Sequence, residues 1–313
     1  MKMFLVWAMS LGFVACTEKR ADQTDGSVVA SVGMIADVVR EIAAGDLAVV
    51  SLIGEGIDPH TFQPGKSDVE RIQKAGLVLY HGLYLEGKMG SVFENRRDRG
   101  HRIAAVAEGL EEVSLIGGES HPDPHLWMDV ALWSKVAAGI AVELAAFAPD
   151  KAAAFQDRLE RYQEKLATLD QYARVAMASI PEERRILVTA HDAFSYLGRA
   201  YGIEVRGIQG ISTESEAGTK DINDLVNLLV TRKVPAIFVE SSVSDKSVRA
   251  VIEGAAQQGH TVTIGGKLYS DAMGNPGTYE GTYIGMIDHN VTTIVRALGG
   301  EAPATGFQDK LNR

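Results

Sequence analysis

The amino-acid sequence predicts an α/β protein made of two lobes, each with a mainly parallel sheet, joined by one long helix. Three observations lead to this fold class. Short apolar runs rich in β-branched residues alternate with amphipathic helical segments from residue 28 to about residue 148. Residues 150–179 contain neither Gly nor Pro and have a helical period. The alternation of strand and helix patterns then starts again at residue 186.

The N-terminal lobe is predicted to occupy residues 27–148. Its expected strands are 28–32, 48–53, 77–80 and 103–106, and its expected helices are 33–44, 67–76, 86–95 and 130–147. Ser67 is the expected N-cap of the second of these helices, because Glu70 follows it by three residues as in a capping box. The last helix is expected to end before Pro149.

Residues 149–180 are predicted to form the linking helix. Its apolar residues lie three and four positions apart, at Phe155, Leu159, Tyr162, Leu166, Leu169 and Ala173. A helix of this length would be about 45 Å long, which exceeds the reach of a crossover helix in one small lobe. The C-terminal lobe follows at 181–313, with expected strands 186–189, 204–208, 236–240 and 261–264 and expected helices 193–201, 216–232, 245–258 and 283–298.

Residues 1–15 have the features of a signal peptide. Lys2 precedes the apolar stretch Phe4–Ala15, which is short for a membrane span. The sequence up to Cys16 resembles the lipobox of bacterial lipoproteins, with Phe13 where Leu is usual. We therefore expect an extracytoplasmic protein, in the periplasm or at the cell surface, anchored to the membrane by a lipid on Cys16, with 16–26 as a flexible tether. The alternatives are a plain signal peptide without the lipid and a fortuitous apolar start.

The composition narrows the classes of partner. The chain has 313 residues, a formal net charge of −10 and a single cysteine. The acidic balance argues against nucleic acid as the main partner. One cysteine can form neither an internal disulfide nor a Cys-based zinc site. The sequence contains no Walker A motif and no Gly-x-Ser-x-Gly elbow, so nucleotide binding has no support.

Three of the eight histidines and one aspartate lie in loops or at strand ends, where ligands bind in α/β proteins. They are His60, His125, His191 and Asp271. Three imidazoles and one carboxylate suit a tetrahedral site for a divalent cation. His60 and His125 belong to the first lobe and the other two to the second, which would place the site in the interlobe cleft. Spacing alone leaves open that they are ordinary loop or capping residues.

Longer motifs surround these four residues. They read GIDPHTFQP at 56–64, DPHLWMD at 123–129, TAHDAFSYLGRAYG at 189–202 and SDAMG at 270–274, with GISTESEA at 210–217 and FVESSV at 238–243 in addition. In these motifs the chain resembles the solute-binding lipoproteins of zinc and manganese ABC importers, the ZnuA/TroA type. The resemblance extends from about residue 28 to residue 298.

The resemblance implies a function and a ligand set. In that family the metal ligands are the histidines of the first three motifs and the aspartate of the last, which correspond to His60, His125, His191 and Asp271. The family fold is two Rossmann-like lobes joined by one long helix, with the metal in the interlobe cleft. The protein is then expected to capture a divalent cation outside the cell membrane and deliver it to an ABC permease. We expect a monomer that is not an enzyme.

The identity of the metal depends on His191. Manganese-type relatives usually have Glu at this position, and three nitrogen donors suit zinc better than manganese, so Zn²⁺ is expected with Mn²⁺ as the alternative. The short segment 115–121 lacks the His-rich loop of many zinc-type members, which favours the alternative. From another class, a zinc metallohydrolase would use His60, His125 and His191 and keep one position open.

The remaining polar and aromatic candidates are expected to be mainly structural. Glu240 ends a strand near the cleft, where a hydrogen bond to a metal ligand is the alternative role. His81, where the family commonly has Asn, is expected to be a strand-end residue. His121 is separated from His125 by two prolines and is not expected to be a ligand. Trp127 and Trp133 are expected to pack.

Overall fold

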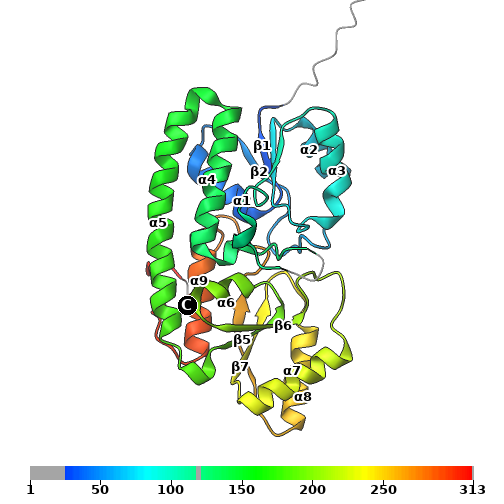
Figure 1. Ribbon diagram of the computed structural model, residues 1–313, viewed down its shortest axis with the longest axis vertical. Coiled ribbons are helices and arrows are strands. Elements are labelled where there is room, and N and C mark those ends of the chain that lie inside the picture. Colours follow the sequence, from blue (N-terminus) through cyan, green and yellow to red (C-terminus); the bar gives the residue numbers. More distant parts are fainter. Residues whose placement is uncertain (1–24, 118–120, 312–313) are drawn as a thin grey trace, which may run out of the picture.

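The protein has two α/β lobes arranged end to end beside a long helix, as the computed structural model shows for residues 25–117 and 121–311 (Figure 1). The predicted signal peptide, Cys16 and most of the tether lie outside the described residues. The predicted fold class is confirmed, since both lobes contain parallel strands connected by helices. The predicted limits 27–148, 149–180 and 181–313 stay predictions.

The first lobe contains one four-stranded parallel sheet in the order β2-β1-β3-β4. Its strands are β1 (Val28–Ala30), β2 (Val49–Ser51), β3 (Leu77–Tyr80) and β4 (Ile103–Ala105), and its helices are α1 (Gly33–Ala43), α2 (Lys66–Lys74), α3 (Gly90–Asp98) and α4 (Val130–Phe147). Short 3₁₀ turns lie at Gly87–Met89, Glu112–Ser114 and Leu126–Met128. Val28 of the central strand lies opposite both Val49 and Leu77.

Two expected helix starts are wrong. The α2 helix begins at Lys66, its N-cap is Gly65, and the backbone N–H of Gly65 donates to the Asp68 carboxylate at 2.9 Å. Asp68 is therefore the acidic residue that accepts from the N-cap backbone, the role that the sequence suggested for Glu70. The expected helix 86–95 begins only at Gly90, because the carboxylate of Glu86 is buried and accepts hydrogen bonds from Ser31 and from the backbone of His81.

The long helix is present as α5 (Ala152–Ala178), preceded by a 3₁₀ turn at Pro149–Lys151. Its 27 residues correspond to about 40 Å. The side chains that predicted it are all buried: Phe155, Leu159, Tyr162, Leu166, Leu169 and Ala173. The helix runs past both lobes in Figure 1 and packs against α4 and α1 of the first lobe and against α9.

Among the described residues, α4 is the one helix whose length and apolarity would allow it to cross a membrane. It packs against α1 and α5, and eight of its residues are buried in the fold. Its N-terminus is fixed by Asp129, whose carboxylate accepts from the backbone N–H of Leu132 at 3.0 Å. The helix is therefore a core element of the first lobe.

The second lobe contains two parallel strand pairs that lie side by side. The strands are β5 (Ile186–His191) with β6 (Glu204–Gln209), and β7 (Ala236–Glu240) with β8 (Thr263–Leu268), and β5 packs against β7. The helices are α6 (Ser195–Tyr201), α7 (Thr219–Arg232), α8 (Lys246–Gln257) and α9 (Tyr283–Ala297), and a 3₁₀ turn lies at Glu182–Arg184. His191 is thus the last residue of a strand.

The larger apolar core is continuous between the lobes. It includes the strands and helices of the first lobe, α5, α6, α9 and residues of the second lobe such as Leu187 and Phe238. A smaller core lies between the second lobe's strands and the helices α7 and α8. The loops between the two lobes are therefore supported on both sides by packed side chains.

Candidate metal centre

Four side chains from four distant segments converge between the lobes: those of His60, His125, His191 and Asp271. One ligand atom from each lies within 4.8 Å of the others, and all four residues are buried. His60 lies in the loop after β2, His125 before the 3₁₀ turn that leads into α4, His191 at the end of β5 and Asp271 after β8. The fold therefore brings together the four residues that the sequence suggested.

The distances between the ligand atoms suit a tetrahedral cation. Nε2 of His60 and Nε2 of His125 are 3.3 Å apart. The Asp271 carboxylate oxygens lie 3.3 Å from Nε2 of His125, 3.2 Å from Nε2 of His191 and 4.0 Å from Nε2 of His60. A tetrahedral ion with ligands at ~2.0–2.1 Å requires separations of about 3.3 Å.

His125 is oriented by a carboxylate of its own loop. Its Nδ1 lies 2.7 Å from Oδ1 of Asp123, which also accepts from the backbone N–H of His125 at 2.9 Å. A carboxylate oxygen accepts, so Nδ1 carries a proton, and Nε2 presents its lone pair to the centre once its own proton is displaced. Burial alone lowers the pKa of His125, but Asp123 and Asp271 outweigh it and raise that pKa to about 9.

His191 is oriented in the same way by a residue from another strand. Nδ1 of His191 lies 2.5 Å from Oε2 of Glu240, and the backbone N–H of His191 donates to Oε1 at 2.8 Å. Burial opposes protonation, but Glu240 and Asp271 together hold the pKa of His191 well above its usual value. Of the two roles considered for Glu240, the structure supports the hydrogen bond to a candidate metal ligand.

The ring of His60 has no such carboxylate contact. Asp58 accepts from the backbone N–H of His60 at 2.8 Å, and its other oxygen accepts from the hydroxyls of Thr61 and Thr213. Burial lowers the pKa of His60 to about 4, against the opposing influence of Asp271. This imidazole is therefore neutral at pH 7 and already in the form that binds a metal.

The Asp271 carboxylate is buried and its two oxygens have no hydrogen-bond partner, and the same is true of Nε2 of His191. Unsatisfied buried polar atoms are rare and need an explanation, which a bound cation supplies. Burial raises the pKa of Asp271, but His191 and His125 outweigh it and hold the pKa well below its usual value. The donor set therefore fits a divalent cation.

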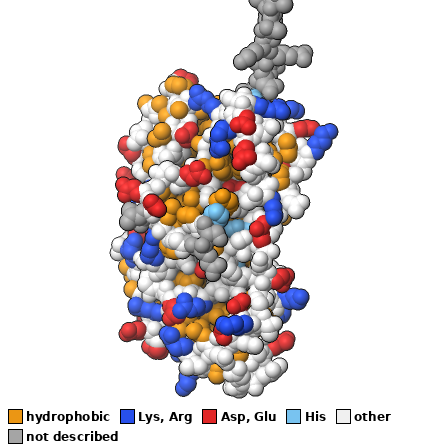
Figure 2. Space-filling model, turned by 45° about the vertical axis from the view of Figure 1, so that its right-hand side comes forward, with side chains coloured by type: hydrophobic (Ala, Val, Ile, Leu, Met, Phe, Trp, Pro, Cys, Tyr) orange, Lys and Arg blue, Asp and Glu red, His pale blue; other side chains and the backbone are white. Residues whose placement is uncertain are grey.

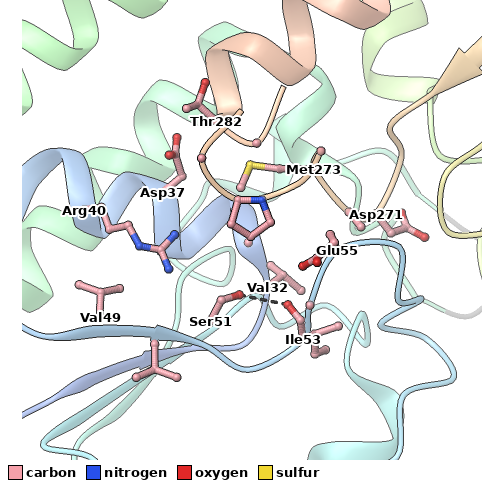
Figure 3. A pocket seen from close by; sticks show the side chains of 18 residues that line it. Val32, Asp37, Arg40, Val49, Ser51, Ile53, Glu55, Asp271, Met273 and Thr282 are labelled. Atoms are coloured by element: carbon pink, nitrogen blue, oxygen red, sulfur yellow. Dashed lines mark hydrogen bonds between the residues drawn. The ribbon is translucent and has the colours of Figure 1, made fainter. Parts of the chain in front are cut away.

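Two pockets adjoin this cluster. A pocket of about 680 Å³ lies beside the ends of β1 and β2 and includes Asp271 among its lining residues. Figure 3 shows Asp37 and Arg40 of α1 on one side of it and Asp271 on the other. A second pocket, of about 560 Å³, is lined by His60, Tyr84 and residues 210–212. Each pocket thus touches one of the four residues.

The outer surface contrasts with this buried polar cluster. On the face shown in Figure 2, basic and acidic side chains are interspersed over both lobes. The four candidate ligands are at most 3% exposed. A cation that reaches them is therefore removed from bulk water.

Four other histidines, at positions 81, 121, 260 and 289, do not join the cluster. His81 is fully buried at the end of β3, has no hydrogen-bond partner for its ring nitrogens and packs against Trp127 and Trp133, and burial lowers its pKa to about 3. His121 is exposed and stacks on Tyr84. His260 and His289 contact backbone carbonyls of Val234 and Lys267 at 2.8 Å each.

Comparison with known proteins identifies relatives along nearly the whole chain. The family model described as "Zinc-uptake complex component A periplasmic" matches residues 28–297. The zinc-binding protein TroA of Treponema pallidum (strain Nichols) is 46% identical over 300 residues, covering 94% of this chain and 96% of that protein. The manganese-binding lipoprotein MntA of Bacillus subtilis (strain 168) is 46% identical over 282 residues, covering 90% and 92%.

The fold of a solved relative agrees as well. The structure described as the periplasmic zinc binding protein TroA from Treponema pallidum superimposes with a TM-score of 0.86 at 47% sequence identity. The superposition covers 87% of this chain and 99% of that structure.

Proposed function

This chain belongs to the ZnuA family of extracytoplasmic metal-binding components of ABC transporters, and we propose that its cargo is Zn²⁺. The family is one of binding proteins and not of enzymes, so the metallohydrolase alternative is not retained. In the proposal, His60, His125, His191 and Asp271 ligate the ion. The loaded protein then delivers it to the permease of its transporter.

The observation that carries the ligand assignment is the convergence of three imidazole nitrogens and one carboxylate in a buried site. Four of their six separations are 3.2–4.0 Å and all six are at most 4.8 Å, which agrees with one ion bound by all four. Four protein ligands leave no open tetrahedral position for a reacting water. Such a site holds an ion and releases it only when the ligands move apart.

Three nitrogen donors favour Zn²⁺ over Mn²⁺, which prefers oxygen. The second candidate, Mn²⁺, is supported by the two free oxygens of Asp271, each of which lies near a different imidazole and could bind the ion. The two relatives named above, one described as zinc-binding and one as manganese-binding, are equally similar to this chain. The nitrogen count decides our choice.

The proposal extends to the rest of the chain. A lipid on Cys16 would tether the protein to the membrane through residues 16–26, and the protein would act as a monomer. The lobes 27–148 and 181–313 would supply two ligands each across the linking helix 149–180.

The test is a metal analysis of protein purified without chelator, followed by competition titrations with zinc and manganese. Alanine variants of His60, His125 and His191 should each lose zinc affinity by at least about 100-fold, since each removes a ligand. His289→Ala is the matched control, because His289 lies outside the cluster, where its ring contacts the backbone carbonyl of Lys267 and the ring of Tyr269. Wild-type affinity in a ligand variant with a native circular-dichroism spectrum would remove that residue from the site.

Selectivity is tested at the third ligand. His191→Glu replaces a nitrogen donor by an oxygen donor and should lower the ratio of zinc affinity to manganese affinity. The ratio is the quantity to measure, since zinc binds more tightly than manganese to most donor sets. An unchanged or higher ratio would contradict the assignment of Zn²⁺ from the nitrogen count.

A further inference from the structure

Trp127 is a fully buried residue that connects the two lobes next to the candidate ligands. It lies in the 3₁₀ turn Leu126–Met128, two residues after His125. Its indole N–H crosses to the second lobe and donates to the backbone carbonyl of Ser270 at 2.8 Å. Ser270 directly precedes Asp271, so a first-lobe side chain holds the backbone of a second-lobe ligand.

The same indole also contacts a first-lobe ligand. The ring of Trp127 lies edge-on to the ring of His125, with centroids 5.3 Å apart at an angle of 71°. Its own backbone carbonyl accepts from the hydroxyl of Tyr283 at 2.8 Å. Trp127 is therefore fixed at its backbone and in contact with one ligand, while it bonds the residue before another.

The Asp271 loop is also bonded within the second lobe, since Asn290 of α9 donates to the carbonyl of Tyr269 at 2.7 Å and accepts from its backbone N–H at 2.9 Å. The hydroxyls of Ser242 and Ser270 are 3.0 Å apart, and the Ser241 hydroxyl donates to the carbonyl of Ala272 at 3.3 Å. The carboxylate itself accepts no hydrogen bond that would orient it. The position of this ligand therefore depends on its backbone, and the hydrogen bond to the carbonyl directly before it, that of Ser270, comes from Trp127.

Trp133 provides a matched comparison within the same chain. It is also fully buried, in α4, and its ring stacks on Tyr283 at 5.7 Å. Its indole N–H has no hydrogen-bond partner. The two tryptophans thus offer equal bulk to the core, but only Trp127 joins the lobes through its N–H.

We propose that Trp127 is a positioning residue that places Asp271 in register with the three histidines before the metal arrives. A ligand that is already in place loses little freedom on binding, and groups behind a ligand typically change metal affinity by about 10- to 100-fold. The inference rests on the proposed function, because it assigns a role to Trp127 only if these four residues bind the metal.

The experiment compares Trp127→Phe with Trp133→Phe in zinc competition titrations and stopped-flow release to a chelator. Both changes remove the same atoms from the core, but Trp127→Phe also leaves the Ser270 carbonyl without its donor, so it should lower thermal stability more than Trp133→Phe does. Trp127→Phe should weaken zinc binding by about 10- to 100-fold and speed release, while Trp133→Phe should stay within about threefold of the wild type. Equal affinities in the two variants would overturn the proposal.

The outcomes separate this inference from the function on which it rests. A wild-type protein that binds no zinc contradicts the proposed cargo. If the wild type binds zinc and the two Phe variants have equal zinc affinities, only the role of Trp127 is contradicted.

A second measurement covers the case in which Trp127→Phe does not fold. In the mature chain without the predicted leader, Trp127 and Trp133 are the only indoles. The Trp133→Phe protein therefore has one indole N–H, which nuclear magnetic resonance can follow during exchange with deuterated water. Slow exchange in both the metal-free and the zinc-loaded protein is expected, because the bond to Ser270 forms without metal. Fast exchange in the metal-free protein would overturn the proposal.

Discussion

The tripeptide Asp-Pro-His occurs twice in the first lobe, at 58–60 and at 123–125, and the two copies build their ligands differently. In both, the aspartate accepts from the backbone N–H of the histidine, at 2.8 and 2.9 Å. Only Asp123 also contacts the histidine ring, at 2.7 Å from Nδ1 of His125. Asp58 instead accepts from the hydroxyl of Thr213 in the second lobe.

The difference follows from burial. Asp123 is fully buried, and its nearest charge partner is the ring of His125. Asp58 is half-buried and reaches a hydroxyl across the interlobe boundary. The same tripeptide therefore produces one imidazole, that of His125, whose ring contacts the preceding aspartate, and one, that of His60, whose ring does not. The first is predominantly cationic without metal and the second is neutral, as their pKa values of about 9 and about 4 indicate.

The largest expected effect that separates the two copies is on the stability of the metal-free protein. His125→Ala leaves the Asp123 carboxylate buried without its cation, and breaking a buried pair costs about 3–5 kcal/mol. His60→Ala removes a neutral ring and should cost at most about 2 kcal/mol. Urea unfolding of both metal-free variants measures the difference. Equal losses would mean that His125 carries no charge in the free protein.

The next effect concerns the two aspartates. Asp123→Asn should lower zinc affinity by about 10- to 100-fold, because it weakens the bond that orients the ring of His125. Asp58→Asn should change it by less than about threefold, since Asp58 does not touch the ring of His60. Competition titration gives both values. A large loss in Asp58→Asn with a small loss in Asp123→Asn would reverse the comparison.

The pH dependence of zinc binding should come from histidines whose rings contact a carboxylate, as that of His125 does, and not from His60. The raised pKa of His125 means that the free protein binds a proton there at pH 7, which zinc must displace. The pKa of His191 is raised as well, so zinc must displace a proton from each ring, and zinc affinity should rise by up to about 100-fold per pH unit from about pH 6 to about pH 8. His60, with a pKa near 4, contributes nothing in this range.

Calorimetric titration in buffers of different ionisation enthalpy counts the released protons directly. His60→Ala is the control, and the protons it releases per zinc ion bound should match the wild-type number. Zinc binding without proton release at pH 7 would contradict the raised pKa of His125.

The smallest effect is expected at the hydroxyls around Asp58. Thr213→Val removes the donor from the other lobe and should destabilise the protein by about 1 kcal/mol, with a slightly faster zinc release. Thr61→Val removes a donor to the same oxygen from within the loop and is the matched control. Thermal unfolding and chelator-induced release measure both. Identical release rates in the two variants would show that the contact between lobes does not matter for the metal.

Helical periodicity was sufficient to locate the linking helix, since the residues that repeat between 155 and 173 are all buried on one side of α5. The expected starts of two other helices were wrong, in both cases because a different hydrogen bond formed than the one that the local sequence suggested. Ser67 does not cap α2 because Gly65 and Asp68 form that contact two residues earlier. Glu86 does not start a helix because its buried carboxylate binds Ser31 and the backbone after β3.

The sequence by itself determined the fold class, the long helix and the four candidate ligands, because periodicity and short motifs are local properties of the chain. The tertiary structure alone decided which group forms the hydrogen bond that orients each candidate ligand. Glu240 is 49 residues from His191, and Ser270 is 143 residues from Trp127. Such pairs depend on the order of strands in a sheet and on how the lobes pack. A local pattern determines which face of an element is buried, but not which distant element covers it.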